Sequence, residues 1–329
     1  MTWTGKQVLV TGAGGFIGSH LCEALVQAGA EVTAMIRYSS RSDWGNLELL
    51  PPDHKANLRV VAGNIEDSDF VARQVKGKAV VFHLAALIAI PYSYVAPLSY
   101  VRTNVEGTLN VLEAARNVGV EKVVHTSTSE TYGTAIYAPI DEKHPLQGQS
   151  PYSASKIGAD KIAESYYLSF NLPVATIRPF NTYGPRQSAR AVIPTIISQA
   201  LTQPQIKLGS LTPVRDLTFV KDTVRGFLKI AEAPASVGEV INIGSGKGVT
   251  IGELAQLILG LMNSDKPIVT DETRIRPEKS EVMKLICNAE KAAALVGWQP
   301  NYTLEQGLAE VIDFVTHHQA LFKPNQYTL

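Results

Sequence analysis

A glycine-rich segment near the N-terminus restricts the possible folds of this chain more than any other feature of the sequence. Residues 11–18 read TGAGGFIG, directly after the apolar run 8–10 and before apolar residues at helical spacing. Glycines between a strand and a helix permit a tight turn, and the free N–H groups of the helix attract a pyrophosphate. This placement predicts a dinucleotide site rather than a bare structural turn. The residues expected to contact the cofactor here are Gly12, Gly15, Phe16, Ile17 and Gly18.

The first half of the chain predicts an α/β fold. Short β-branched runs alternate with helical patterns, of which the longest lie near 103–118 and 152–170. The expected strands cover residues 8–10, 31–36, 58–62, 79–84, 122–126 and 174–177. Continuous apolar strands separated by helices are typical of a parallel sheet covered on both faces. We therefore expect a doubly wound parallel sheet, a Rossmann fold, with a smaller and mostly C-terminal substrate domain.

The pattern changes after residue 178. Residues 179–217 are rich in Pro, Gly, Gln, Ser and Arg and alternate poorly between apolar and polar positions. A helix over 219–232 and a strand over 239–243 follow, and residues 249–315 are helical with a proline-rich interruption. We predict a dinucleotide-binding domain from residues 1–178 plus about 218–245, and a second domain from about 179–217 plus 246–329.

Charge and cysteine content exclude several classes of protein. Lys plus Arg and Asp plus Glu both number 30, so no excess positive charge favours nucleic acid or an anionic membrane as a partner. The longest apolar stretch, 79–92, contains His83 and Pro91 and is too short to span a bilayer, and the N-terminus resembles no signal segment. Cys22 and Cys287 fit a reduced compartment. We expect a cytoplasmic protein, and no metal site, because the histidines lack ligand-like partners in sequence.

The end of the second expected strand indicates which dinucleotide binds. NAD-binding folds usually carry an acidic residue about 20 residues after the glycine turn. Residues 35–41 read MIRYSSR and contain no carboxylate, whereas Arg37, with Ser39 and Arg41, can accept a 2′-phosphate. The alternative is that these are solvated loop residues. We predict NADP, with NAD as the alternative.

One Tyr–Lys pair has the spacing of a redox catalyst. Tyr152 and Lys156 are four residues apart, so a helix places both side chains on one face. Tyrosine, with a pKa near 10, is a poor base at neutral pH. A nearby ammonium and a positively charged nicotinamide both favour the phenolate and lower that pKa. Tyr152 can then accept a hydroxyl proton while the carbon loses hydride; the alternative is a chance pair on the surface.

The order of several motifs identifies a family resemblance that covers nearly the whole chain. After the glycine turn come HLAA, NVEGT, YSASK and RPFNTYGPR, at 83–86, 104–108, 152–156 and 178–186, followed by Arg215-Asp216 and Arg276-Pro277. Together they resemble the extended short-chain dehydrogenase/reductase family, and within it the nucleotide-sugar 4,6-dehydratases. The chain is most similar to those that make 4-keto-6-deoxy-N-acetylglucosamine nucleotides for legionaminic-acid-type sugars. The resemblance assigns to the cofactor Asn64, which stands where the family often has Asp, and Ile65, Leu84, Ala85, Ala86 and Pro179.

The segment TSTSETYG, at 126–133, separates two reactions of that family. By the resemblance, Thr128 hydrogen-bonds the sugar hydroxyl that Tyr152 deprotonates. Epimerases usually carry small uncharged residues where Ser129 and Glu130 stand, whereas a dehydratase needs a base for the proton on C5. Glu130 fits that base, and its alternative is a solvated loop glutamate. Many dehydratases have Asp where this chain has Ser129, so either protonated Glu130 or a relay through Ser129 delivers the proton to the leaving hydroxyl.

Four polar residues match the positions where the family holds the nucleotide diphosphate. They are Asn181, Arg186, Arg215 and Arg276. A planar guanidinium pairs with phosphate oxygens in two-point contact, although a single arginine is more often in a surface ion pair. The resemblance implies a homodimer through the helices near 103–118 and 152–170. The leading hypothesis is a 4,6-dehydratase acting on UDP- or GDP-N-acetylglucosamine; the alternatives are a 4-epimerase and a binding protein without turnover.

Overall fold

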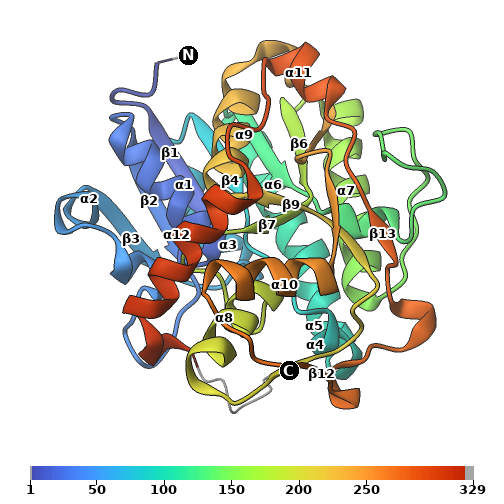
Figure 1. Cartoon of the computed structure of the whole chain (residues 1–329). Coiled ribbons are helices and arrows are strands. Elements are labelled where there is room, and N and C mark those ends of the chain that lie inside the picture. The colour runs from blue at the N-terminus through green and yellow to red at the C-terminus, as the bar shows by residue number, and fades with distance from the viewer. Residues whose placement is uncertain (1, 323–329) are drawn as a thin grey trace.

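Helices cover both faces of a central sheet (Figure 1). This computed structural model describes residues 2–322. Seven strands form the sheet in the order β10-β6-β5-β4-β1-β2-β3, and all neighbouring strands are parallel. They are β1 (Gln7–Thr11), β2 (Glu31–Ile36), β3 (Leu58–Ala62), β4 (Val80–His83), β5 (Lys122–Thr126), β6 (Val174–Pro179) and β10 (Val240–Ile243). The expected doubly wound parallel sheet is confirmed.

The sheet divides the core into two layers. Val8 packs in one apolar cluster with Leu21, whereas the next residue, Leu9, packs in another with Val71 and Leu112. Successive side chains of a strand point to opposite faces, so a strand covered on both sides has to be apolar throughout. The first face is covered by α1 (Phe16–Gln27) and α9 (Val220–Glu232), and the second by α3 (Ser68–Val75), α6 (Gly107–Val118) and α7 (Pro151–Phe170).

Helix α7 begins sharply. Ser150 is its N-cap, Pro151 is the first helical residue, and Ser150 and Ser153 exchange side-chain-to-backbone hydrogen bonds as a capping box. Asn171 ends the helix in the left-handed conformation, at φ 55°. This start places Tyr152 in the first turn, at the edge of the sheet where the strands end.

The expected helix over 103–118 begins earlier and less regularly. A π-helical segment, Val101–Glu106, continues directly into α6. It is preceded by two short helices, α4 (Ile90–Val95) and α5 (Pro97–Tyr100), each with a proline in its first turn. Proline is tolerated there because the first N–H groups of a helix have no intrahelical partner.

The later part of the chain holds more regular structure than its composition suggested. Residues 179–217 contain α8 (Val192–Thr202), β7 (Asn181–Tyr183), β8 (Ile206–Leu208) and most of β9 (Val214–Phe219). The C-terminal residues form β11 (Gly248–Thr250), α10 (Ile251–Leu261), β12 (Ile268–Thr270), β13 (Lys284–Leu285), α11 (Glu290–Val296) and α12 (Leu304–His317). The expected helices over 249–315 are therefore present as α10, α11 and α12, but the short strands β11, β12 and β13 were not expected. Strands of two or three residues are too short to show alternation in sequence.

One buried carboxylate joins the later elements to the main sheet. Asp216 of β9 accepts hydrogen bonds from the backbone N–H groups of Ser245, Gly246 and Cys287, and from the Ser245 hydroxyl. Ser245 and Gly246 follow β10, and β9 pairs with β7, β11 and β13. Asp216 thus fixes the strand that carries Arg215 against the end of the seven-stranded sheet.

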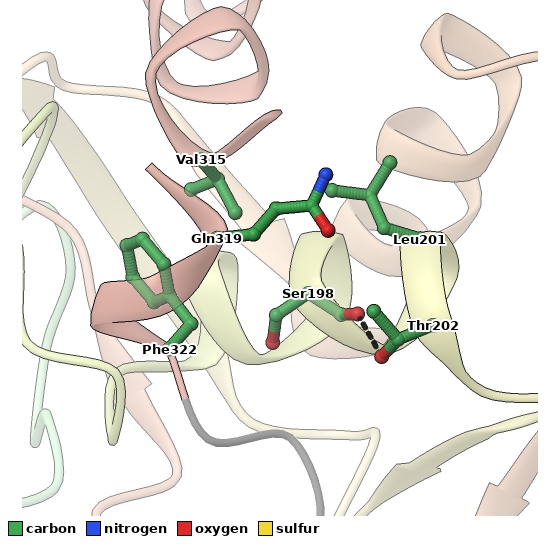
Figure 2. Close-up of a pocket in the computed structure, with 6 residues that line it drawn as sticks. All are labelled: Ser198, Leu201, Thr202, Val315, Gln319 and Phe322. Carbon is green, nitrogen blue, oxygen red and sulfur yellow. Dashed lines mark hydrogen bonds between the residues drawn. The ribbon is translucent and has the colours of Figure 1, made fainter. Parts of the chain in front are cut away.

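A small cavity of about 100 Å³ lies between α8 and the end of α12 (Figure 2). Its lining contains no titratable side chain and none of the predicted cofactor, catalytic or substrate residues; it consists of Ser198, Leu201, Thr202, Val315, Gln319 and Phe322. Within residues 2–322, no helix is long and apolar enough to cross a membrane.

We expect Gly18→Ala to destabilise the fold. A Cβ at Gly18 would lie 2.3 Å from the Gly12 carbonyl oxygen and 3.0 Å from the Ala13 Cα, so backbone would have to move. Overpacking of this kind costs about 1–3 kcal/mol. Gly260→Ala in α10 is the matched control, because nothing lies within 4 Å of its added Cβ. Thermal denaturation that gives Gly18→Ala and Gly260→Ala the same midpoint would contradict the close packing of α1.

Candidate active site

The backbone of the glycine turn packs closely against the residues that follow β4. Gly12 has φ 70°, and a Cβ there would lie 2.8 Å from the Ala85 nitrogen and 2.9 Å from the Leu84 carbonyl carbon. The Thr11 hydroxyl oxygen accepts hydrogen bonds from the N–H groups of Leu84 and Ala85, both at 3.1 Å. The structure therefore brings together the predicted cofactor residues that follow β1 and β4.

The N-terminus of α1 suits a diphosphate. Gly15 is its N-cap, is exposed, and offers no side chain to the first-turn N–H groups of the helix. Phe16 and Ile17 are half-buried in that turn. Free N–H groups together with the positive end of the helix dipole attract anions. The described residues thus fit a dinucleotide.

The remaining predicted cofactor residues lie at the same edge of the sheet. Arg37 and Ser39 are exposed after β2, which ends at Ile36 beside Gly14. Asn64 follows β3 and accepts a hydrogen bond from the Glu66 N–H at 3.2 Å, and Ile65 is buried next to α6. Ala86 follows β4, and Pro179 is buried at the end of β6. Each belongs to the carboxyl end of a strand, where ligands bind in such folds.

Tyr152 and Lys156 are both buried on α7. The Lys156 Nζ donates to the Thr126 carbonyl oxygen at 2.7 Å, and burial lowers the pKa of Lys156 to about 8. Burial also raises the pKa of Tyr152, and the hydrogen bond with Thr128 opposes that rise only in part. The expected lowering of the tyrosine pKa by the lysine is therefore not produced by these residues alone. Desolvation dominates, so the phenolate requires a further positive charge.

Glu130 is buried rather than solvated. It lies in a 3₁₀ turn, η3 (Ser129–Tyr132), whose N-cap Thr128 accepts the Glu130 N–H through its hydroxyl oxygen at 3.3 Å. Glu130 is 9% exposed and Ser129 2%. Burial lowers the pKa of Arg215 and raises that of Tyr152; the negative charge of Glu130 opposes the first shift and adds to the second. The carboxylate is therefore close enough for its charge to act on Tyr152, the predicted catalytic tyrosine, and on Arg215, one of the predicted substrate arginines.

Two of the predicted substrate arginines share a single acidic partner. Glu281 lies 3.1 Å from Arg215 and 3.5 Å from Arg276. Asn181, at the start of β7, has a buried side-chain oxygen without a hydrogen-bond partner among the described residues. Arg186 instead pairs with Glu23 of α1 at 2.7 Å, so its guanidinium is held at the helix of the glycine turn.

A buried polar cluster behind the turn was missed by sequence reasoning. Asp160, one helical turn after Lys156, lies 2.8 Å from Arg178 and accepts hydrogen bonds from Ser127 and His125. Its position four residues after the lysine, and the place of Arg178 in the RPFNTYGPR motif, were available signals. The spacing of two residues between His125 on β5 and Ser127 just after it would also have pointed to a shared partner.

The model of the GDP-mannose 4,6-dehydratase family matches residues 9–311. The chain belongs to this family. A UDP-glucose 4-epimerase from Mycolicibacterium smegmatis is 34% identical over 316 residues, covering 94% of this chain and 98% of the epimerase. A dTDP-D-glucose 4,6-dehydratase from Mus musculus is 32% identical, covering 94% of this chain and 88% of the relative.

A solved structure supports the same assignment. The dTDP-glucose 4,6-dehydratase from Streptomyces venezuelae with NAD bound has a TM-score of 0.86 and 29% identity, and the alignment covers 97% of this chain and 100% of that one. The expected membership of the extended short-chain dehydrogenases is confirmed. Because the relatives include both reactions, the chain is placed among the nucleotide-sugar 4,6-dehydratases and 4-epimerases.

We expect Lys156→Met to stabilise the cofactor-free protein at about pH 7, by about 1–3 kcal/mol. Burial lowers the pKa of Lys156 from 10.5 to about 8, so below that pH the folded parent carries the full desolvation cost. Between about pH 8 and pH 10.5 the folded lysine is neutral while the unfolded one is still charged, so parent stability rises relative to the variant. Urea denaturation across this range should show the difference shrinking. Exposed Lys161→Met, on the same helix, should show no such trend.

Proposed function

We propose that this protein is a nucleotide-sugar 4,6-dehydratase whose substrate is a UDP- or GDP-N-acetylglucosamine. The observation that carries the proposal is the burial of Glu130 at a place where its charge acts on both Tyr152 and Arg215. Oxidation and re-reduction at C4 need no acidic side chain there, and a buried carboxylate is costly unless it has a role or a partner. The alternative activity is a 4-epimerase, which shares the first oxidation.

The side chains divide the proton transfers between them. A bound dinucleotide supplies the hydride acceptor at C4 and the matching donor at C6. Tyr152 takes the C4 hydroxyl proton, and Thr128 orients that hydroxyl. The C4 ketone makes the C5 proton acidic, Glu130 removes it, and the C6 hydroxyl leaves as water after gaining a proton from Glu130 or through Ser129. C5 then takes a proton that comes from solvent, with retention of its configuration, as the resemblance implies.

Two observations support the proposed substrate site: the positive charges of neighbouring arginines, and a buried hydrogen-bond acceptor that has no donor within residues 2–322. Arg215 and Arg276 both form ion pairs with Glu281, and the charge of Glu130 acts on Arg215. A diphosphate bound between the two arginines would therefore place its sugar near the turn Ser129–Tyr132, here called the catalytic turn. Asn181 offers a buried oxygen that lacks a partner among the described residues. Arg186 pairs with Glu23 through its Nη2, whereas its Nη1 is buried without a hydrogen-bond partner in the part of the chain that the structure describes and could contact the substrate. The choice between UDP and GDP rests on no residue of the site.

NADP remains the proposed cofactor, with NAD as the alternative. Arg37 is exposed, and no carboxylate lies in residues 35–41. The two-part division of the chain also remains a proposal, supported by the fact that all seven main-sheet strands lie within 1–178 and 218–245, apart from the last residue of β6. Residues 323–329 of the second part lie outside the described residues.

A cytoplasmic location stays a prediction from the two free, buried cysteines.

We propose a homodimer through α7 and the helical stretch that ends with α6. Large apolar side chains are exposed on both: Val101, Leu109, Val118, Leu168 and Phe170. Exposed apolar residues that gather on neighbouring helices are typical of an interface.

We expect the Glu130→Gln variant still to oxidise the substrate at C4, and so to reduce its cofactor, but to fail to remove water from the substrate. The amide keeps the shape of the side chain but cannot accept the C5 proton, so dehydration should fall about 10²–10⁴-fold. Absorbance at the reduced-nicotinamide band measures the first step, and mass spectrometry measures the loss of water. Glu121→Gln, exposed at the other end of β5, is the control. A parent enzyme that returns product of unchanged mass and altered C4 configuration would establish the epimerase instead.

We expect Arg37→Asp to weaken NADP binding about 10–100-fold, because a charged hydrogen bond to the 2′-phosphate is lost and a like charge is introduced. The Kd for NAD, which lacks that phosphate, should change little or improve. Fluorescence titration with both reduced cofactors measures the ratio. An unchanged preference in the variant would contradict the assignment of Arg37.

A further inference from the structure

Arg178 is a buried arginine that contacts residues at both ends of the catalytic turn. It is the fifth residue of β6, is 3% exposed, and uses three different nitrogen atoms for three side-chain partners. Its Nε donates to the Ser127 hydroxyl at 3.1 Å, its Nη1 to the Tyr132 hydroxyl at 2.7 Å, and its Nη2 to the Asp160 carboxylate at 2.8 Å. The guanidinium is planar and rigid, so these three contacts fix their partners relative to one another.

Two of these partners bracket the catalytic turn. Ser127 directly precedes Thr128, and Tyr132 is the last residue of the turn Ser129–Tyr132. The four residues between them include Thr128, Ser129 and Glu130. A single guanidinium therefore holds both ends of the segment that carries the proposed C5 base. The Tyr132 hydroxyl also donates to the Asn242 side-chain oxygen at 2.8 Å, which ties the far end to β10.

The third partner links the turn to the catalytic helix. Asp160 lies one turn after Lys156 on α7, and its second oxygen is 3.0 Å from the His125 Nε2. Burial opposes its ionisation, but the hydrogen bond from His125 and the charge of Arg178 hold the pKa of Asp160 well below its ordinary value. The carboxylate thus stays charged and holds β5 on the helix that carries Tyr152.

A buried ion pair is weak evidence for stability, since apolar residues of similar volume often stabilise a fold equally well. The geometry points to another use: we infer that the Arg178–Tyr132 hydrogen bond positions Glu130 for C5 deprotonation, while the Arg178–Ser127 and Asp160 contacts hold the end that carries Thr128. This inference rests on the proposed dehydratase function. Arg178 and Tyr132 are positioning residues, because neither is assigned a contact with substrate or cofactor.

The inference predicts a split between the two chemical steps. Tyr132→Phe keeps the ring, whose centroid lies 4.6 Å from the Arg178 guanidinium carbon, and removes only the hydroxyl. C4 oxidation should stay within about twofold of the parent, because Thr128 and Tyr152 remain anchored through Ser127 and Asp160. C5 deprotonation should fall about 10–100-fold, as expected when a catalytic group loses its alignment. The KM should stay unchanged.

The experiment follows both steps in D₂O with the full-length protein and nucleotide sugar. Stopped-flow absorbance gives the rate of cofactor reduction, and mass spectrometry of single-turnover samples gives deuterium incorporation at C5. Tyr137→Phe is the control: its hydroxyl donates to Asp141 at 2.7 Å in the following loop and contacts neither Arg178 nor Asn242. Arg178→Lys is the second variant, because it keeps a charge near Asp160 but cannot reach three partners; since the Ser127 contact is then lost together with the Tyr132 contact, C4 oxidation and C5 deprotonation should both slow.

The outcomes separate the inference from the function on which it rests. A parent enzyme that neither incorporates deuterium at C5 nor loses water would overturn the proposed dehydratase itself. If the parent is active and the Tyr132→Phe variant incorporates deuterium at C5 as fast as the parent, the positioning role is overturned. Equal loss of both steps in that variant, or failure of both variants to fold, would assign the cluster to stability alone and also overturn it.

Discussion

Burial of the parallel strands on both faces dictates where the chemistry of this protein can lie. β4 and β6 are buried along their whole length, so neither face of the sheet can present functional side chains to a ligand. Only the carboxyl ends remain, and a predicted site residue follows nearly every one of them. Gly12 follows β1, Arg37 follows β2 and Asn64 follows β3. In the same way, Leu84 follows β4, Glu130 follows β5 and Asn181 follows β6. Residues far apart in sequence become neighbours because their strands end at one edge.

The same burial makes the charged groups at that edge depend on one another. Lys156, Asp160 and Arg178 are each at most 6% exposed, and isolated charges at such depth would be strongly unfavourable. Asp160 raises the pKa of Lys156 against the effect of burial, and the charge of Arg178 lowers it. The lysine is left with a pKa of about 8, so at neutral pH it is charged in the folded protein and its burial reduces the stability of the fold.

The sequence predicted the parts of the site that depend on local patterns. Gly12 and Gly18 could be assigned because a strand–turn–helix junction tolerates nothing larger, and Tyr152 and Lys156 because four residues make one helical turn. The burial of Glu130 could not be predicted, since a loop glutamate after a strand is usually solvated. The pairing of Arg186 with Glu23, and the sharing of Glu281 by Arg215 and Arg276, depend on contacts between distant segments. α8 was missed because Pro194 and polar neighbours obscured its apolar face.

The acid step is where the dehydratase hypothesis depends most on what the structure adds. Ser129 is 2% exposed, and a serine hydroxyl does not ionise at neutral pH, so it can only pass on a proton that reaches it from elsewhere. C5 and C6 are bonded neighbours, so the group that has just taken the C5 proton is already close to the leaving hydroxyl. We therefore favour Glu130 in both roles. A single carboxylate that serves as base and then as acid has to keep its orientation between two proton transfers, and the Arg178 contacts on either side of its turn supply that restraint.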